Sequence, residues 1–187
     1  AAPATLANVD QALARALENG KDSLLVYIAS HGEQGERARY NYVDLWEGDM
    51  LSVARVAELH DAHPRPLRML VASCYSGGFG DLAFAAADPA KGPARVSRCG
   101  VFAGPWDRQT SGCDPNPDRG AQEGYSMHVL HALIGQDRNG KPLPSGEIDF
   151  NNDGRIGLLE AHTRARIASS SIDVPTTTSE RYLREVE

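Results

Sequence analysis

The sequence has few cysteines and no long apolar run, and both shortages restrict what the chain can be. Three cysteines among 187 residues are too few for a disulfide framework, and their odd number leaves at least one thiol unpaired unless chains are linked to each other. The longest apolar stretches, Leu24 to Ala29 and Met69 to Ala72, fall far short of the ~20 residues that a helix needs to cross a bilayer. No basic-then-apolar leader opens the sequence, so we expect a soluble protein without a membrane span.

Clusters of basic residues are also missing. The formal net charge is −6 and no run of Lys or Arg occurs, which argues against nucleic acid or an anionic membrane as the main partner. A peptide or another small molecule is the favoured partner. No repeat or linker-like tract interrupts the chain, and its 41% hydrophobic content is enough for a continuous core. We therefore expect a single domain over residues 1–187.

Apolar runs typical of strands alternate with helical patterns along the chain. The run from Ser23 to Ser30 predicts a strand buried on both faces, and a second buried strand is expected from Arg68 to Ser73. Ser52 is placed to cap a helix that begins at Val53. We expect further elements in the following ranges: helices at 5–19, 122–135, 158–170 and after 178, and a strand at 99–104. This order predicts an α/β fold with a doubly wound, mostly parallel sheet and helices on both faces.

A histidine and a cysteine follow directly after the two predicted buried strands. His31 precedes a glycine, and Cys74 begins the small-residue turn Cys-Tyr-Ser-Gly-Gly. Because ligands bind beyond the carboxyl ends of the strands in open parallel sheets, we expect both side chains at one edge. Each alone is more often a packing or surface residue. Together they predict a nucleophile, Cys74, with His31 as its proton acceptor, and the N–H groups of Gly32 and Cys74 as an oxyanion pocket.

These two motifs resemble the caspase-like cysteine peptidases, the group of caspases, metacaspases, legumain-type and gingipain-type enzymes. A strand ending in His-Gly and a later strand ending in Ser-Cys-x-Ser-Gly are similar to their dyad motifs. The sequence Ser73-Cys-Tyr-Ser-Gly-Gly78 looks most like bacterial legumain-family (C13-like) and metacaspase-like proteins. The resemblance covers about residues 20–135. It implies that His31 and Cys74 form the dyad, and that Gly32 and Cys74 supply the oxyanion N–H groups.

Three departures limit what this resemblance implies. Metacaspases that cut after basic residues have an aspartate where this chain has Ala72, and caspases have an arginine where it has Tyr75. Neither basic nor aspartate specificity therefore carries over. Caspase-like sheets also begin with a strand and helix before the histidine strand, whereas this chain opens with a helix alone. We expect a processed or truncated form whose first strands are missing or are supplied by an N-terminal segment or a second chain.

The loop after the third expected strand is a candidate substrate pocket. In the fold that the resemblance implies, this loop lines the site, and here it reads Gly104-Pro-Trp-Asp-Arg-Gln-Thr-Ser111. Trp106 would form a wall. Asp107 would be a counter-charge for a basic group and Arg108 for an acidic one, and we favour Asp107. An ordinary capped surface loop is the alternative explanation of the same residues.

Residues 149–160 match the twelve-residue EF-hand calcium loop. Oxygen ligands are expected from Asp149, Asn151 and Asp153, a backbone carbonyl from Arg155, and a bidentate carboxylate from Glu160, with Gly154 at the sixth position. A surface turn rich in Asp and Asn explains the composition but not the placement of the glycine and the glutamate. The prolines and glycine before the loop exclude an entering helix, so half an EF-hand holding a structural calcium ion is predicted.

Together these features predict a calcium-binding cysteine endopeptidase of bacterial style in an extracytoplasmic setting, periplasmic or secreted. Two alternatives stay open. The same dyad would serve a transpeptidase or amide ligase, and a non-catalytic calcium-binding interaction module would keep the fold without turnover. Cys99 and Cys113 are either a disulfide or two free thiols.

Overall fold

The computed structural model describes residues 2–111 and 124–187, and the chain divides into two compact units. Unit 1 comprises residues 1–110 and 176–187, and unit 2 comprises residues 111–175. The expectation of a single domain stays a prediction, because compact units of this size also occur within one domain.

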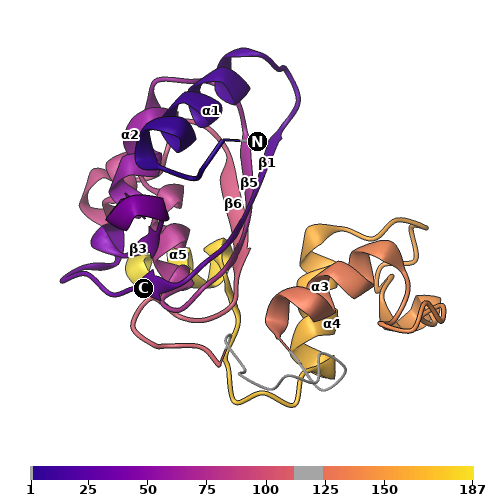
Figure 1. Ribbon diagram of the computed structural model, residues 1–187. Helices are drawn as coiled ribbons and strands as arrows, with labels where there is room; N and C mark the ends of the chain where they lie inside the picture. Colours follow the sequence, from indigo (N-terminus) through magenta and orange to yellow (C-terminus); the bar gives the residue numbers. More distant parts are fainter. Residues whose placement is uncertain (1, 112–123) are drawn as a thin grey trace. The chain divides into compact units, whose positions relative to one another are not determined.

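Unit 1 is built around a four-stranded sheet with the order β1-β5-β6-β7 (Figure 1). The strands are β1 (Leu24–Ala29), β5 (Leu67–Ala72), β6 (Arg98–Phe102) and β7 (Thr176–Thr177). The first three of these run parallel, and β7 pairs antiparallel with β6. The prediction of an α/β fold with a mostly parallel sheet is therefore confirmed.

The two strands that precede the candidate dyad differ in burial. β5 lies between β1 and β6, and Leu67, Met69, Leu70 and Val71 are buried in it. β1 lies at the edge of the sheet, and its burial alternates, with Leu25 62% and Tyr27 49% exposed. The prediction of a β1 buried on both faces was wrong. A continuous apolar run marks a strand but does not show whether a second layer covers its outer face.

Helices α1 (Leu6–Glu18) and α2 (Val53–Asp61) lie on one side of this sheet (Figure 1). The Thr5 hydroxyl accepts the N–H of Asn8 at 3.4 Å, and the Ser52 hydroxyl accepts the N–H of Arg55 at 3.1 Å. Each cap satisfies an N–H group that would otherwise lack a partner at the start of its helix. Both predicted helices are confirmed, including the cap at Ser52.

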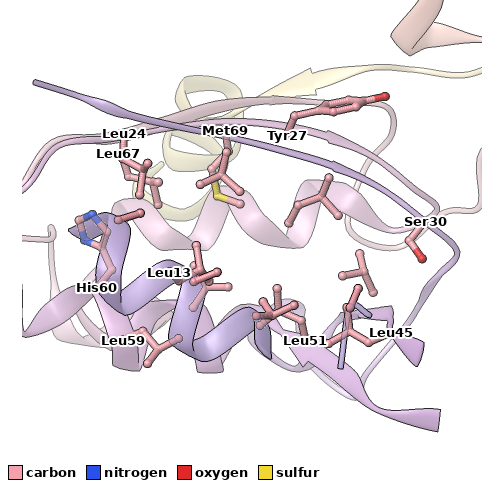
Figure 2. Close-up of a pocket in the computed structure, with 18 of the residues that line it drawn as sticks. Leu13, Leu24, Tyr27, Ser30, Leu45, Leu51, Leu59, His60, Leu67 and Met69 are labelled. Carbon is pink, nitrogen blue, oxygen red and sulfur yellow. The ribbon is translucent and has the colours of Figure 1, made fainter. Parts of the chain in front are cut away.

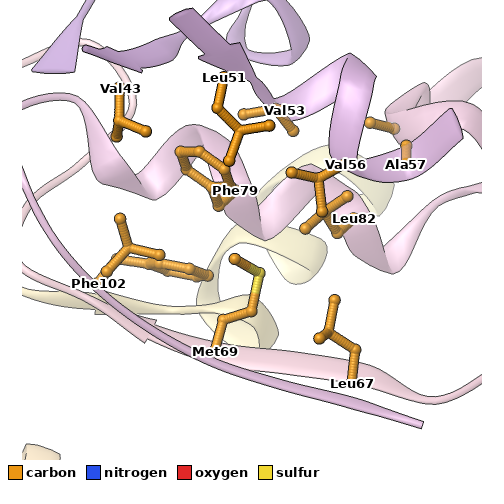
Figure 3. Packing of buried hydrophobic residues seen from close by; sticks show 12 residues of the cluster. Val43, Leu51, Val53, Val56, Ala57, Leu67, Met69, Phe79, Leu82 and Phe102 are labelled. Carbon is orange, nitrogen blue, oxygen red and sulfur yellow. The ribbon is translucent and has the colours of Figure 1, made fainter. Parts of the chain in front are cut away.

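The core of unit 1 lies between the sheet and the segments that cover its inner face. Phe79 sits at its centre, with Leu51 and Val53 on one side and Met69 and Phe102 on the other (Figure 3). Phe79 belongs to a 3₁₀ helix, η3 (Ser76–Ala83), that follows the cysteine turn. Burial of this segment therefore anchors the chain immediately after Cys74.

A small antiparallel sheet, β2-β3-β4, extends unit 1 beyond the end of β1. Its strands are β2 (Gly32–Glu33), β3 (Tyr42–Asp44) and β4 (Met50–Ser52). The 3₁₀ helices of unit 1 besides η3 are η1 (Ala38–Tyr40), η2 (Trp46–Gly48), η4 (Ala85–Ala87) and η5 (Pro89–Lys91). These elements are too short for a periodic pattern to show in the sequence.

The final helix of unit 1, α5 (Thr178–Val186), begins at a capping box. The Thr177 hydroxyl accepts the N–H of Glu180 at 3.1 Å, and the Glu180 carboxylate accepts the N–H of Thr177 at 2.8 Å. The reciprocal pair fixes the first turn of the helix. The predicted helix after residue 178 is confirmed.

Unit 2 is a helical pair formed by α3 (Tyr125–Ile134) and α4 (Leu158–Ala168), with one short 3₁₀ helix, η6 (Ser145–Glu147), between them in sequence. The hydroxyl of Tyr125 and Nδ1 of His162 lie 2.7 Å apart in the buried space between the two helices. Both helices fall within the predicted ranges. Across the described part of the chain, no helix is long and apolar enough to cross a membrane.

Candidate active site

The register of β1 and β5 brings the ends of the two strands together. The strands are parallel, with Ala29 opposite Ala72. Both strands end at this pair, and His31 and Cys74 each follow two residues later in the chain. Neighbouring strands lie roughly 4.8 Å apart, so the register predicts an imidazole and a thiol as neighbours at the carboxyl edge of the sheet. His31 is exposed and Cys74 is half-buried.

Gly32 lies directly against the backbone of Cys74. A Cβ atom at Gly32 would stand 2.3 Å from the carbonyl oxygen of Cys74 and 3.0 Å from the hydroxyl of Ser73. No side chain fits in that space, so the close approach of the two strand ends requires glycine here. This contact shows independently of the register that the two motifs meet.

The backbone N–H of Gly32 points away from β3. Gly32 pairs with Val43 in the antiparallel ladder, and the N–H of Asp44 donates to the carbonyl oxygen of His31 at 3.0 Å. Because this bond joins the flanking residues, Gly32 and Val43 do not bond to each other through their own N–H and C=O groups. In such a pair the N–H groups face outward from the ladder. The geometry is compatible with the predicted role of Gly32 as an oxyanion donor.

The chain turns sharply just after Cys74. Tyr75 has a φ of 56°, in the left-handed region that residues with a side chain rarely adopt. Its N–H donates to the carbonyl oxygen of Arg108 at 3.0 Å, which pins the turn to the loop after β6. The turn ends β5 and starts η3, and it leaves Cys74 at the junction.

Asn41 joins three segments around this turn, and the sequence analysis missed it. Its side chain, only 1% exposed, donates to the carbonyl oxygens of Tyr75 at 3.0 Å and Trp106 at 2.7 Å. The side-chain oxygen Oδ1 of Asn41 accepts the N–H of Gly35 at 3.0 Å. A buried amide with three partners is a strong positional constraint. Because its partners at the site lie 34 and 65 residues away in the chain, no local pattern could reveal this role.

The two glycines of the cysteine turn allow backbone segments to pack closely. A Cβ at Gly77 would lie 2.7 Å from the carbonyl oxygen of Gly104 and 2.7 Å from the nitrogen of Trp106. A Cβ at Gly78 would lie 2.7 Å from the carbonyl oxygen of Ala38. The glycine pair therefore lets η3 contact the loop after β6 and the segment before β3.

The predicted pocket residues lie on the loop after β6, next to the cysteine turn. Trp106 is half-buried, and the guanidinium of Arg181 stands 5.5 Å from the centre of its ring, within cation–π range. Arg181 also forms an ion pair with the buried Asp81 at 2.7 Å. Trp106 is thus held on both its backbone and its ring, while Asp107 is exposed.

Asp81 is a second buried polar residue that the sequence analysis missed. Burial raises the pKa of its carboxyl, and the hydrogen bond from Arg181 opposes that rise. The pair links η3 to α5, so the C-terminal helix contributes to the support of the loop that carries Trp106. Its two members lie 100 residues apart in the sequence.

A large apolar cavity lies in unit 1, and the candidate dyad is not part of its lining. Its volume is about 560 Å³, and it is enclosed by α1, β1 and α2 (Figure 2). Leu13, Leu24 and Met69 line it, and neither His31 nor Cys74 does. At one end lies His60, which is 2% exposed. Burial, followed by the positive charge of Arg98, lowers the pKa of His60 from 6.5 to about 4.

In the loop at 149–160, the side chains at positions one, three, five and twelve accept hydrogen bonds from backbone N–H groups of the same loop. Asp149 accepts the N–H of Gly154 at 3.0 Å, and Asn151 accepts that of Asp153 at 2.9 Å. The carboxylate of Asp153 accepts the N–H of Arg155 at 2.8 Å. These bonds organise the backbone around the side-chain oxygens that the motif assigns as ligands.

Glu160 closes the same loop from the first turn of α4. One of its carboxylate oxygens accepts the N–H groups of Phe150 at 2.9 Å and Asn151 at 3.3 Å, and the other accepts that of Gly157 at 2.8 Å. Gly154 adopts a φ of 77°, so the sixth position has the backbone for which the motif requires glycine. Within residues 2–111 and 124–187, no group of three or more His, Cys, Asp or Glu side chains stands close enough to hold a metal. The EF-hand motif also uses an amide and a backbone oxygen as ligands, so calcium binding at this loop stays a prediction.

The other two cysteines of the chain are Cys99 and Cys113. Cys99 is exposed on β6 with a free thiol. Cys113, the partner in the candidate disulfide, lies outside the described residues.

No family model and no curated protein matches the chain. Among solved structures, the chain is similar to the crystal structure of protein GSU0716 from Geobacter sulfurreducens, with a TM-score of 0.47 and 13% identity over 93% of this chain and 72% of that one.

Proposed function

We propose that the chain is a caspase-like cysteine peptidase in which Cys74 is the nucleophile and His31 its base. The observation that supports the proposal is the meeting of two parallel strand ends: Ala29 pairs with Ala72 two residues before His31 and Cys74, and Gly32 lies against the Cys74 carbonyl. The resemblance of both motifs to caspase-like peptidases adds support, and so does the position of the pair at the carboxyl edge of a mostly parallel sheet. The finer fold assignment, a caspase-like sheet with helices on both faces, is part of the same proposal.

In this proposal the reaction is hydrolysis of a peptide bond through an acyl-enzyme. His31 takes the proton of the Cys74 thiol, and the sulfur attacks the scissile carbonyl carbon. The N–H groups of Gly32 and Cys74 stabilise the oxyanion, an interaction worth about 3 kcal/mol per donor in comparable enzymes. The protonated His31 then passes its proton to the leaving amine, and water hydrolyses the thioester to release the acid and regenerate the thiol. Transfer of the acyl group to an amine instead of water would make the same dyad a ligase.

The substrate is proposed to be a peptide segment that runs beside the loop after β6. Trp106 supplies an apolar surface whose position is fixed from two sides, and Asp107 offers an exposed carboxylate for a basic group. A cleavage profile on a peptide library tests both activity and preference. We expect the wild type to cut and Cys74→Ala to be inactive. Equal background for both proteins would favour the non-catalytic interaction module.

We also propose that the loop at 149–160 binds one structural calcium ion through Asp149, Asn151, Asp153, the carbonyl of Arg155 and Glu160. Two observations support this assignment. The sequence matches the motif at each diagnostic position, and the side chains at positions one, three, five and twelve accept hydrogen bonds from backbone N–H groups of the loop. An extracytoplasmic location, where calcium is plentiful, is part of the proposal.

A further strand is proposed to complete the sheet beside β1, supplied by an N-terminal segment or a second chain. Among the described strands, β1 pairs with β5 alone in its sheet, and Leu25 and Tyr27 on its outer face are exposed. Unpaired strand edges of this kind are templates for another strand. Amide hydrogen exchange tests the claim: the β1 amides facing away from β5 should exchange quickly in the chain alone and slowly once the N-terminal segment or second chain has paired with β1. Fast exchange of these amides in both cases would contradict the proposal.

A further inference from the structure

The sulfur of Cys74 is surrounded by three polar atoms of a single residue, Thr110. The N–H of Thr110 lies 3.3 Å from the sulfur, its hydroxyl 3.7 Å and its carbonyl oxygen 3.5 Å. Two of these groups are donors and one is an acceptor. Thr110 is 36 residues from Cys74 in sequence, so the contact depends on the folded loop.

The position of Thr110 is fixed by two contacts in the same loop. Two residues earlier, the carbonyl of Arg108 accepts the N–H of Tyr75 at 3.0 Å, which aligns the loop with the cysteine turn. A Cβ at Gly104 would lie 2.4 Å from the Thr110 methyl carbon. The missing side chain of Gly104 therefore leaves the space that the Thr110 side chain fills. The hydrogen bond at Arg108 and the space at Gly104 together keep Thr110 next to the sulfur.

We propose that Thr110 stabilises the thiolate of Cys74, a role that rests on the proposed nucleophile. In the thiol form the S–H donates to the carbonyl oxygen of Thr110. When the proton moves from the sulfur to the imidazole of His31, the sulfur becomes an acceptor and takes hydrogen bonds from the N–H and the hydroxyl of Thr110. The S–H bond is replaced by an N–H bond on the imidazole, and the hydrogen bond from the thiol to the Thr110 carbonyl is lost. Hydrogen bonds to an ionised partner are roughly twice as strong as those between neutral groups, so both donors favour the reactive form.

Substitution of Thr110 by valine removes the hydroxyl and keeps the shape and the backbone N–H. At pH 7 we expect Thr110→Val to slow alkylation of Cys74 by iodoacetamide about five- to tenfold. Thr110→Ser keeps the hydroxyl and should stay within about twofold of the wild type, a rescue that loss of packing would not produce. Alkylation of Cys99, on β6, should be the same in all three proteins and serves as the internal control.

Three outcomes separate this inference from the proposed function. Wild-type reactivity of Cys74 in Thr110→Val would overturn the inference, whether or not the protein cuts peptides. Equal slowing in the valine and serine variants would also overturn it, because packing and not the hydroxyl would then be responsible. Slowing in the valine variant alone, in a wild type that cleaves no peptide, would support the inference and contradict only the peptidase. Should Thr110→Val fail to fold by circular dichroism, Thr110→Ala is compared with Thr110→Ser by the same criteria.

Discussion

The side-chain amide of Asn41 donates a hydrogen bond of 2.7 Å to the carbonyl oxygen of Trp106. The same nitrogen donates to the carbonyl of Tyr75, directly after the candidate nucleophile. One buried side chain therefore sets the distance between the cysteine turn and the loop that is proposed to bind substrate. Asn41 touches neither Cys74 nor His31 in these bonds, so its role is to position other groups.

Replacing Asn41 by leucine, which has a similar volume, should damage both stability and the proposed activity. Two buried carbonyl groups lose their donor, and each such group costs about 1–3 kcal/mol. We expect thermal unfolding to show a loss of about 2 to 6 kcal/mol, twice the cost of one group. As a matched control, Asn8→Leu, which removes a hydrogen bond at the exposed start of α1, should cost less than about 1 kcal/mol. Similar losses for the two variants would contradict the positioning role.

Substitution of Gly32 by alanine should separate the two strand ends. The new methyl group would stand 2.3 Å from the Cys74 carbonyl oxygen, so one of the two segments must shift. We expect at least a tenfold loss of peptide cleavage with intact secondary structure by circular dichroism. Gly48→Ala is not an adequate control because its φ is positive, whereas Gly146→Ala meets no atom within 4 Å and should be neutral. Full activity in Gly32→Ala would show that the contact does not matter for the site.

Acid should destabilise unit 1 through His60. The folded-state pKa of His60 is about 4, below the ordinary value of 6.5. Between these two pH values the unfolded chain therefore binds a proton at His60 more readily than the folded chain does. The contribution of His60 to stability is therefore complete above about pH 6.5 and is lost as the pH falls to about 4, by up to about 3 kcal/mol. Denaturant unfolding at several pH values should show that the free energy of unfolding falls less steeply with acid in His60→Leu than in the wild type. The same dependence of stability on pH in His60→Leu as in the wild type would refute the assignment.

Calcium should raise the melting temperature of the protein. An ion that binds the folded state at one hundred times its dissociation constant adds about 2.7 kcal/mol of stability. We expect this increment to disappear in Asp149→Ala and Glu160→Ala, and to persist in Asp137→Ala, a carboxylate of the same unit that binds the backbone at Asn139 and Lys141. The increment, not the starting stability, is the measure, because Glu160 also caps α4. No shift at millimolar calcium would remove the site.

The sequence predicts the main elements of unit 1 because each depends on local signals. The hydroxyl of Ser52 caps α2, and the apolar residues from Leu67 to Val71 form the central strand β5, as expected. A parallel sheet brings strand ends to one edge, so the pairing of His31 with Cys74 follows from two local strand assignments. Asn41 and Thr110 were not predicted, because their roles come from contacts made across 34 to 65 residues of chain. The exposed face of β1 was also missed, since Leu25 and Tyr27 look the same in sequence whether or not another layer covers them.

The reactivity of Cys74 with and without His31 tests the central claim most directly. The wild type and His31→Ala are treated with iodoacetamide at pH 7. The labelling rates of Cys74 and Cys99 are measured in the same digest by mass spectrometry. The account predicts that Cys74 reacts at least tenfold faster than Cys99 in the wild type, and that His31→Ala reduces this advantage while the rate of Cys99 stays constant. Equal and slow labelling of both cysteines, unchanged by His31→Ala, would contradict a thiol and an imidazole acting together at the end of β1 and β5.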